Sequence, residues 1–225
     1  MPSPEPSLLD HIPDDTSPDT LLFAFLEWVE GRGLELYPHQ EEAIISIFGG
    51  DNVVLATPTG SGKSMVALAG AFAMVAQGKR AVYTAPIKAL VSEKFFEMVA
   101  ALGADNVGMV TGDAAVNSDA PVIVCTAEIL ANRSLREGND TDVDLVVMDE
   151  FHYYGDRDRG WAWQVPLLEL RRPNFLLMSA TLGDTTELQE DLSRRTGRGT
   201  VLVSGAERPV PLDFEYRETT LLETI

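Results

Sequence analysis

Apolar residues recur along the chain in two alternating patterns. Short runs that are apolar at nearly every position predict strands covered on both faces, as in a parallel sheet flanked by helices. Longer stretches with apolar residues at helical spacing predict the helices between them. The strands are expected at residues 52–56, 80–85, 106–110, 121–126, 144–149, 174–179 and 200–204. The helices are expected at residues 63–77, 88–102, 127–137, 160–171 and 185–196. This alternation predicts an α/β domain with a mostly parallel central sheet and helices on both faces.

The residues before the first strand divide into two parts. Residues 1–19 hold five prolines and five acids without any Lys or Arg, and we expect a flexible tail because such a segment has little to bury. From Thr20, apolar residues at helical spacing predict a short helix that closes near Gly31. A second helix is expected to begin after Pro38 and to stop at Gly49.

Length and composition fit one globular domain. The chain has 225 residues, of which 45% are hydrophobic and 23% charged. We expect this domain to span residues 20–204. Residues 205–225 form a Pro-containing stretch without a clear element, and we expect a linker toward a second domain that the sequence does not contain.

Charge restricts the kinds of partner. Acidic residues outnumber basic ones by 35 to 17, and the resulting net charge of −18 repels polyanions over most of the surface. Any contact with nucleic acid must therefore be local. The acidity itself is more typical of solubility than of a basic partner.

One cysteine and the lack of a leader pattern indicate the compartment. Cys125 lies inside the apolar run "PVIVCTA", cannot form an internal disulfide, and is interpreted as a small buried strand residue. The N-terminus has no signal-peptide pattern, and "LLFAFLEWVE" is interrupted by Glu27 and too short to span a bilayer. We expect a soluble, cytoplasmic, monomeric chain without a membrane partner.

The strongest chemical signal is a turn of small residues between a strand and a helix. The sequence "TPTGSGKS" matches the P-loop template, except that Thr57 stands where glycine is usual. Gly60 and Gly62 allow backbone N–H groups to wrap around oxyanions, and the following helix points its positive end at them. Lys63 would reach the β- and γ-phosphates, and the Ser64 hydroxyl would bind Mg²⁺. The residues expected to bind the nucleotide here are Thr57, Pro58, Thr59, Gly60, Ser61, Gly62, Lys63 and Ser64.

Two adjacent acids follow another strand, in "DLVVMDE". By itself an acid pair after a strand is more often a solvated loop, but the upstream P-loop and His152 favour a site. The end of the strand would deliver Asp149 toward Mg²⁺ and Glu150 toward the γ-phosphate. Because adjacent strand residues point to opposite sides, we expect the two acids to have different roles.

At this point the motifs carry a resemblance to a known family. "DEFH" (149–152) resembles motif II of the DExH helicases of superfamily 2, and its partners stand in the same order. "ATPTGSGKS" resembles motif I, "TAPIKAL" motif Ia, "TGDAAVN" and "TAEIL" the following nucleic-acid-contact motifs, and "SAT" motif III. "LYPHQEEAI" resembles the adenine-reading Gln motif, and "DxxRG" (156–160) follows the wording of the Ski-type, exosome-associated RNA helicases. The resemblance covers residues 34–211 and implies a RecA-like motor domain that binds ATP and Mg²⁺.

The resemblance also implies roles for single residues. Gln40 would read adenine, Lys63 and Ser64 would hold phosphate and metal, Asp149 would bind the metal through its water shell, and Glu150 would position the attacking water. His152, Ser179 and Thr181 would couple the nucleotide state to the grip on nucleic acid. The "MSATL" stretch could also simply end a strand and cap a helix through Thr181 or Asp184, and the two roles can coexist.

Five positions match the nucleic-acid contacts of such helicases. They are Pro86, Lys88, Gly112, Asp113 and Thr126. One lysine with backbone amides and hydroxyls is enough for a sequence-independent contact with a single strand, although Lys88 alone would read as a solvated surface lysine. Arg133 and Arg136 are a weaker guess for an extension of this path.

The aromatic residues near the acid pair are open to two interpretations. Tyr153, Tyr154, Trp161 and Trp163 invite a role in base stacking. Because the two tryptophans lie near the start of a helix that carries further apolar residues, we favour packing.

Helicases of this type hydrolyse ATP between two RecA-like domains, and the second domain supplies arginine fingers. "SRRTGRG" (193–199) has a similar composition but belongs to the first domain. We therefore expect a first motor domain that is nearly inactive alone, since an arginine finger contributes about 10³–10⁵ in rate. The expected partners are the second RecA-like domain and a single strand, with RNA favoured over DNA. A DNA translocase of the same superfamily and a regulatory nucleotide-binding module without unwinding activity remain as alternatives.

Overall fold

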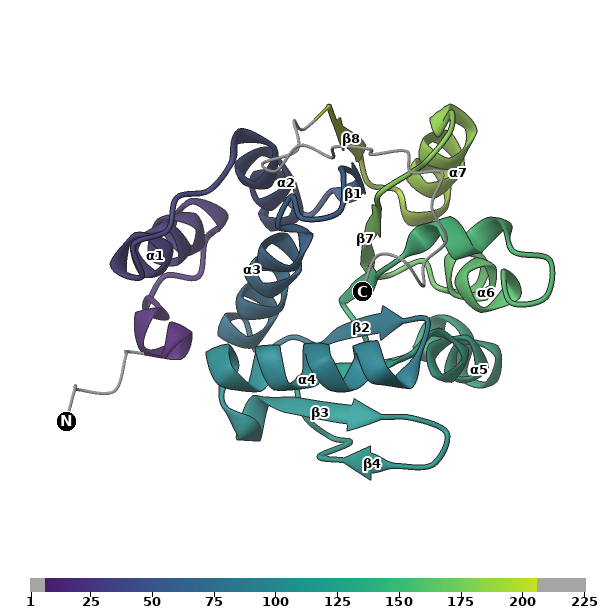
Figure 1. Ribbon diagram of the computed structural model, residues 1–225, viewed down its shortest axis with the longest axis horizontal. Coiled ribbons are helices and arrows are strands. Elements are labelled where there is room, and N and C mark those ends of the chain that lie inside the picture. The colour runs from purple at the N-terminus through teal and green to yellow at the C-terminus, as the bar shows by residue number, and fades with distance from the viewer. Residues whose placement is uncertain (1–6, 206–225) are drawn as a thin grey trace, which may run out of the picture.

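The computed structural model describes residues 7–205, which form one sheet between two layers of helices (Figure 1). The strands are β1 (Asn52–Ala56), β2 (Ala81–Ala85), β3 (Val107–Val110), β4 (Ala115–Val116), β5 (Val122–Thr126), β6 (Leu145–Met148), β7 (Asn174–Ser179) and β8 (Thr200–Ser204). The α-helices are α1 (Pro18–Gly31), α2 (Pro38–Phe48), α3 (Lys63–Ala76), α4 (Lys88–Leu102), α5 (Ala127–Glu137), α6 (Trp161–Glu169) and α7 (Thr186–Thr196). Short 3₁₀ turns are η1 (Leu8–His11), η2 (Ala104–Asn106), η3 (Gly138–Asp140) and η4 (Phe151–Gly155).

The sheet has the order β4-β3-β5-β2-β6-β7-β1-β8. Every neighbouring pair is parallel except β3 and β4, which are antiparallel. The carboxyl ends of the parallel strands therefore meet at one edge, where α/β sheets bind their ligands. The predicted fold class is confirmed: this is a RecA-like α/β domain with a mostly parallel sheet.

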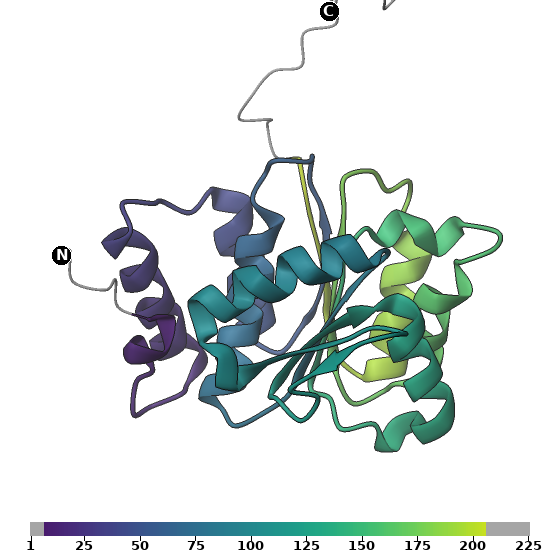
Figure 2. The same ribbon diagram turned by 60° about the horizontal axis from the view of Figure 1, so that its bottom comes forward.

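Two hydrophobic cores lie on opposite faces of the sheet, because successive strand residues point to opposite sides. In β1, Val53 and Leu55 join the core under α1 to α4, whereas Val54 joins the core under α5 to α7. Figure 2 shows the purple, blue and teal helices on one side and the green and yellow helices on the other. Strands buried on both faces explain why the sequence shows continuous apolar runs instead of alternation.

The N-terminal segment differs from the prediction of a flexible tail over residues 7–19. Leu8 is completely buried in the core beside α1, α3 and α4, and the Ser7 hydroxyl donates to the carbonyl of Ala101 at 3.2 Å. A capping box of Ser7 and Asp10 closes the η1 turn. The composition of residues 1–19 gave no sign that the single side chain of Leu8 would be buried in the core. Residues 1–6 of the predicted tail lie outside the described residues.

The remaining boundaries differ from the predictions by one or two residues, but one strand and the short 3₁₀ turns were not predicted. The α1 helix begins at Pro18 instead of Thr20, and β6 ends at Met148, one residue before Asp149. The two-residue strand β4 was not predicted, because it lies in a stretch interpreted only as a nucleic-acid-contact motif. Gly205 is the last described residue, so the predicted linker of 205–225 falls almost entirely outside the structure.

Candidate nucleotide site

The candidate site lies at the carboxyl edge of the sheet, where the loops after β1, β6 and β7 come together. These three strands are neighbours in the order β6-β7-β1. The loop after β1 is the phosphate loop, the residues after β6 are the acid pair, and β7 ends at Ser179. The topology therefore places the motifs predicted for nucleotide and metal next to each other, although they are separated by about half of the chain.

The phosphate loop has the backbone that its glycines were expected to allow. Gly60 and Gly62 have φ values of 84° and 76°, in the left-handed region where a side chain is strained. A Cβ at Gly62 would also overlap the side-chain amide of Gln40. The α3 helix starts at Lys63, so that its free N–H groups and positive dipole end face the loop. The geometry is that of an anion cradle.

Lys63 folds back over this cradle. Its ammonium donates to the carbonyl oxygens of Thr57 at 2.8 Å and Pro58 at 3.1 Å. Burial lowers the pKa of Lys63 below its usual range, and the negative charges of Glu150 and Asp149 oppose this shift. The lysine and the two acids are therefore close enough to interact electrostatically, which is the relationship that a phosphate–metal site requires.

Two neighbouring side chains of α2 hold the phosphate loop from behind. Gln40 donates from Nε2 to the carbonyl of Gly62 at 2.9 Å and accepts a hydrogen bond from the backbone N–H of Tyr37 at 2.8 Å. His39 Nε2 lies 2.9 Å from the carbonyl oxygen of Ser61. Gln40, predicted to read adenine, thus first acts here as a brace for the loop.

Thr57, the departure from the usual glycine, has a structural role. It is completely buried, and its hydroxyl accepts a hydrogen bond from the Ser61 hydroxyl at 2.7 Å across the loop. Its backbone N–H donates to the carbonyl of Ser179 at 3.1 Å. The residue therefore ties the phosphate loop to itself and to the end of β7.

Asp149 is held by two donors. The Tyr83 hydroxyl donates to Oδ2 at 2.5 Å, and the backbone N–H of Glu150 donates to Oδ1 at 2.9 Å. Burial and the adjacent Asp149 carboxylate raise the pKa of Tyr83 well above its usual range. Tyr83 was not predicted as a site residue. Its signal in the sequence is a phenol in an otherwise apolar strand, whose hydroxyl needs a partner when buried.

Glu150 does not continue the strand, which corrects the argument that strand alternation separates the two acids. It follows the end of β6 with φ 49°, a left-handed conformation that costs a non-glycine residue about 1–2 kcal/mol. Its Oε2 lies 3.2 Å from His152 Nδ1. The two acids do have different partners, as predicted, but a turn of the backbone and not the pleat of a strand separates them.

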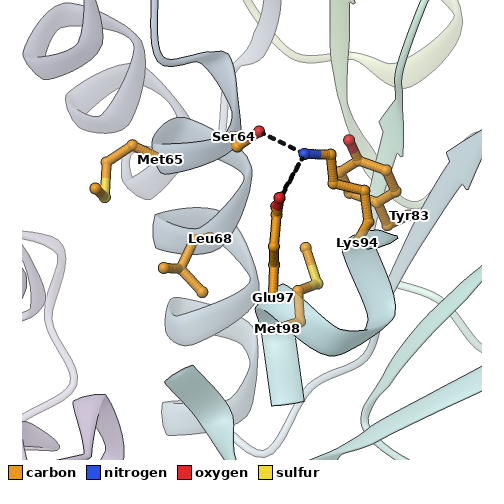
Figure 3. Close-up of a pocket in the computed structure, with 7 residues that line it drawn as sticks. All are labelled: Ser64, Met65, Leu68, Tyr83, Lys94, Glu97 and Met98. Atoms are coloured by element: carbon orange, nitrogen blue, oxygen red, sulfur yellow. Dashed lines mark hydrogen bonds and ion pairs between the residues drawn. The ribbon is translucent and has the colours of Figure 1, made fainter. Parts of the chain in front are cut away.

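A cavity of about 190 Å³ lies beside the phosphate loop, between α3 and α4 (Figure 3). Lys94 crosses its mouth, donating to the Ser64 hydroxyl at 3.1 Å and pairing with Glu97 at 2.9 Å and Glu93 at 3.3 Å. Burial lowers the pKa of Lys94, but the bonds and charges of Glu97 and Glu93 outweigh it and keep the pKa above the ordinary value. Lys94 was also missed, because nothing in its local sequence marks it. Its ammonium is hydrogen-bonded to the hydroxyl expected to bind Mg²⁺.

The "SAT" residues bond mainly to one another. The backbone N–H of Thr181 donates to the Ser179 hydroxyl at 3.2 Å, which in turn donates to the Thr181 carbonyl at 3.0 Å. Asp184, the alternative cap, accepts from the backbone N–H of Thr186 at the start of α7. His152 pairs with Glu150, so its predicted coupling to Ser179 and Thr181 stays a prediction.

Comparison with known proteins now places the chain. A family model described as DEAD/DEAH box helicase matches residues 37–188, more than half of the chain. The chain belongs to the DEAD/DEAH box helicase family. The match begins in the Tyr37–Gln40 turn and extends through the phosphate loop, the acid pair and the "SAT" residues.

Individual relatives support the resemblance to Ski-type helicases. The chain is 37% identical to the DExH-box ATP-dependent RNA helicase DExH15 of Arabidopsis thaliana, over 79% of this chain and 16% of that protein. It is 37% identical to the antiviral helicase SKI2 of Saccharomyces cerevisiae, over 80% of this chain and 14% of that protein. For the probable helicase HelY of Mycobacterium tuberculosis the identity is 35%, over 77% and 19%. The chain thus spans less than a fifth of the length of these relatives.

A solved structure supports the fold. The helicase domain of Hef from Pyrococcus furiosus superposes with a TM-score of 0.59 at 22% identity, covering 78% of this chain and 39% of that one. This likeness concerns the architecture alone.

Among residues 7–205, none of the helices is both long and apolar enough to cross a bilayer.

The residues predicted to contact nucleic acid lie at the same edge of the sheet as the candidate nucleotide site. Pro86 and Lys88 follow β2, Gly112 and Asp113 follow β3, and Thr126 is the last residue of β5. These three strands are adjacent in the sheet. Lys88 and Asp113 form an ion pair at 2.7 Å, and the hydrogen bonds from Lys88 and Thr111 lower the pKa of Asp113. Pro86 and Thr126 are buried, so they offer backbone atoms more readily than side chains. Gly112 is exposed.

The structure also shows the surroundings of Arg133, Arg136 and the two tryptophans near the acid pair. Arg133 pairs with Glu137 at 2.8 Å, and Arg136 lies near the same carboxylate, so both are engaged along α5. Trp163 is completely buried and stacks on Tyr153 with ring centroids 5.3 Å apart, which supports the packing interpretation. Trp161, however, is 40% exposed.

Proposed function

We propose that this chain is the ATP-binding first motor domain of an ATP-dependent RNA helicase. The observation that carries the proposal is the arrangement of Lys63 over the phosphate loop with Asp149 and Glu150 beside it. A lysine charge, free helix N–H groups and two carboxylates are the components with which P-loop motors bind and hydrolyse a nucleoside triphosphate. RNA is favoured because one of the relatives above, DExH15, is named an RNA helicase, and because the sequence motifs resemble those of Ski-type RNA helicases.

The residues present fit a magnesium ion bound with the nucleotide. Ser64 and Asp149 provide hydroxyl and carboxylate oxygens, the ligand atoms that Mg²⁺ prefers, and Mg²⁺ keeps several waters that a second-shell carboxylate can bind. When bound, the ion would neutralise charge that develops on the phosphates. Lys63 would hold the β- and γ-phosphates, and Gln40 would face the adenine.

Glu150 is proposed to hold the attacking water, with His152 fixing the carboxylate. Their 3.2 Å contact leaves the second carboxylate oxygen of Glu150 free to accept a hydrogen bond from water. The negative charge of the transition state would be stabilised by an arginine from a second RecA-like domain. The 225-residue chain should therefore bind nucleotide but hydrolyse it very slowly. Single-strand contact would run over the loops after β2, β3 and β5.

Nucleotide binding is tested with a fluorescent ATP analogue and the purified chain. Lys63→Ala should weaken binding at least tenfold, whereas Glu150→Gln should bind normally. In the complete protein, Glu150→Gln should abolish ATP turnover with binding retained, and unchanged turnover would remove Glu150 from its role.

The substrate is tested by competition between matched RNA and DNA single strands for the complete protein. Preference for RNA with strand separation supports the proposal. Preference for DNA would favour a DNA translocase, and nucleotide binding without any strand separation would favour a regulatory module.

A further inference from the structure

Arg159 joins three segments that are far apart in the sequence. Its Nη2 donates to the carbonyl oxygen of Pro86 at 2.5 Å, just beyond the end of β2. The same Nη2 lies 2.6 Å from Oε1 of Glu128, in the first turn of α5, and Nε lies 3.2 Å from that oxygen. One guanidinium therefore bridges the loop that carries Lys88 and the helix that follows Thr126.

A second set of contacts connects Arg159 to the segment that carries Asp149. Its guanidinium carbon lies 5.6 Å from the ring centroid of Tyr153 and 5.9 Å from that of Trp163. Trp163 in turn donates from Nε1 to the backbone carbonyl of Asp149 at 3.3 Å. Contacts thus run without a gap from Asp149, through Trp163 and Arg159, to Pro86.

The loop before α6 is built to aim this side chain. Oδ1 of Asp156 accepts hydrogen bonds from the backbone N–H groups of Asp158 at 2.9 Å and Arg159 at 2.8 Å, and these bonds lower the pKa of Asp156. A Cβ at Gly160 would lie 2.5 Å from the carbonyl of Asp156 and 2.6 Å from that of Tyr154. The D-x-x-R-G pattern is therefore explained locally: the aspartate and the glycine shape a tight turn, and the arginine projects from it.

The contacts need the planar fork of an arginine. The carbonyl oxygen of Pro86 and the carboxylate of Glu128 both accept hydrogen bonds, so the residue between them must donate in two directions. The guanidinium carbon also lies over the rings of Tyr153 and Trp163, where a cation is attracted to the ring faces. A lysine keeps the charge but lacks the planar fork of donors that holds both oxygens in a fixed geometry.

We propose that Arg159 is a positioning residue that holds the loops after β2 and β5 in register with the Asp149 segment. This inference rests on the proposed function, because it takes those loops to be the path of the single strand. In the proposed function Asp149 would bind the metal that accompanies the nucleotide, and the contacts of Trp163 and Arg159 connect its segment directly to the loop after β2.

The test compares Arg159→Lys and Arg159→Gln with the matched variants Arg157→Lys and Arg157→Gln. Arg157 lies in the same loop, is exposed, and makes no hydrogen bond or ion pair in the part of the chain that the structure describes. Two affinities are measured for each chain: that for a fluorescent ATP analogue, and that for a labelled single-stranded RNA oligonucleotide by fluorescence anisotropy. Thermal melting monitors folding.

Both Arg159 variants should bind the oligonucleotide about tenfold more weakly while their affinity for the ATP analogue changes less than twofold. The Arg157 variants should match the unaltered chain in both measurements. Glu128→Gln, which approaches the same contact from α5, should weaken oligonucleotide binding in the same direction. Combined with Arg159→Gln, it should add little, because the two residues act as one unit.

Three results would overturn the inference. Arg159→Lys could bind the oligonucleotide as well as the Arg157 variants do. The losses for nucleotide and oligonucleotide could be equal and accompanied by a lower melting temperature, which is what a general structural role predicts. The two substitutions could be fully additive. If the unaltered chain binds the ATP analogue but no oligonucleotide, the proposed nucleic-acid function fails first, and the inference fails with it.

Discussion

The Tyr83 hydroxyl donates a 2.5 Å hydrogen bond to Oδ2 of Asp149. Tyr83 lies in β2, and Asp149 directly follows the neighbouring strand β6. Asp149 is the carboxylate expected on the metal side of the nucleotide. A phenol that is 1% exposed therefore fixes the orientation of a group whose function depends on orientation.

Tyr83→Phe should weaken the effect of Mg²⁺ on nucleotide binding by about tenfold, since partners of metal-site carboxylates commonly contribute that much to metal affinity. Binding of the ATP analogue in the presence of a chelator should stay within twofold. The measurement is a Mg²⁺ titration of analogue fluorescence. Tyr154→Phe is the control, because that hydroxyl has no partner among the described residues; identical titrations for both variants would contradict the prediction.

The raised pKa of Tyr83 predicts how stability depends on alkaline pH. A group whose folded pKa is raised stabilises the fold fully below its unfolded pKa, about 10 for tyrosine, and this contribution is lost as the pH rises toward the folded value. Of the five tyrosines, Tyr83 should ionise only when the chain unfolds. Subtracting the phenolate absorbance of Tyr83→Phe from that of the unaltered chain isolates this group. A difference that titrates near pH 10 in the folded chain would be evidence against it.

Lys94→Met should have the opposite effect on the metal. The ammonium on the Ser64 hydroxyl opposes a second cation there, and its removal leaves Glu93 and Glu97 with an uncompensated negative charge. In the Mg²⁺ titration of analogue fluorescence, half of the total change should therefore be reached at a several-fold lower Mg²⁺ concentration than in the unaltered chain. Lys79→Met serves as the control, because the Lys79 side chain is exposed and within residues 7–205 bonds only to Gln77. A higher Mg²⁺ requirement would show that Lys94 supports the site.

Cys125 should be inert in the folded chain. It is 2% exposed, and burial raises the pKa of its thiol to about 12, so hardly any thiolate exists at about pH 8. A colourimetric thiol reagent should react at a negligible rate until urea unfolds the protein and should then modify one thiol per chain. Rapid reaction without denaturant would show that the packing around Cys125 opens in the folded chain.

Leu8→Ala should lower the free energy of unfolding by about 2–5 kcal/mol, as expected for a fully buried leucine. Phe23→Ala on α1, a residue that is 70% exposed, should change it by no more than about 0.5 kcal/mol. Urea denaturation measures both. Equal stability of the two variants would restore the original idea that the N-terminal segment is loosely attached.

The features predictable from the sequence are those that local physics determines. A strand buried on both faces must be apolar throughout, and the left-handed turns of the phosphate loop require Gly60 and Gly62. These two rules predicted the sheet and the anion cradle. The position of Cys125 inside an apolar strand follows in the same way.

The missed features depend on how distant segments meet. Tyr83 and Asp149 become partners only because β2 pairs with β6 in a register that places Thr84 opposite Met148. Lys94 reaches Ser64 because α4 lies beside α3. Leu8 is buried because α1, α3 and α4 meet around the η1 turn. Neither strand order nor register can be read from the spacing of residues within one element, so these contacts were not predicted.

The position of β7 between β6 and β1 determines the order in which this protein can become functional during synthesis. The phosphate loop and the acid pair are complete in a nascent chain of 150 residues, yet the strand that separates and aligns them spans Asn174–Ser179. Until the ribosome has added those residues, no strand joins β1 to β6 by hydrogen bonds. An emerging chain should therefore bind no nucleotide until β7 has inserted, and a truncation before residue 174 should lose the site although every phosphate-binding residue is present.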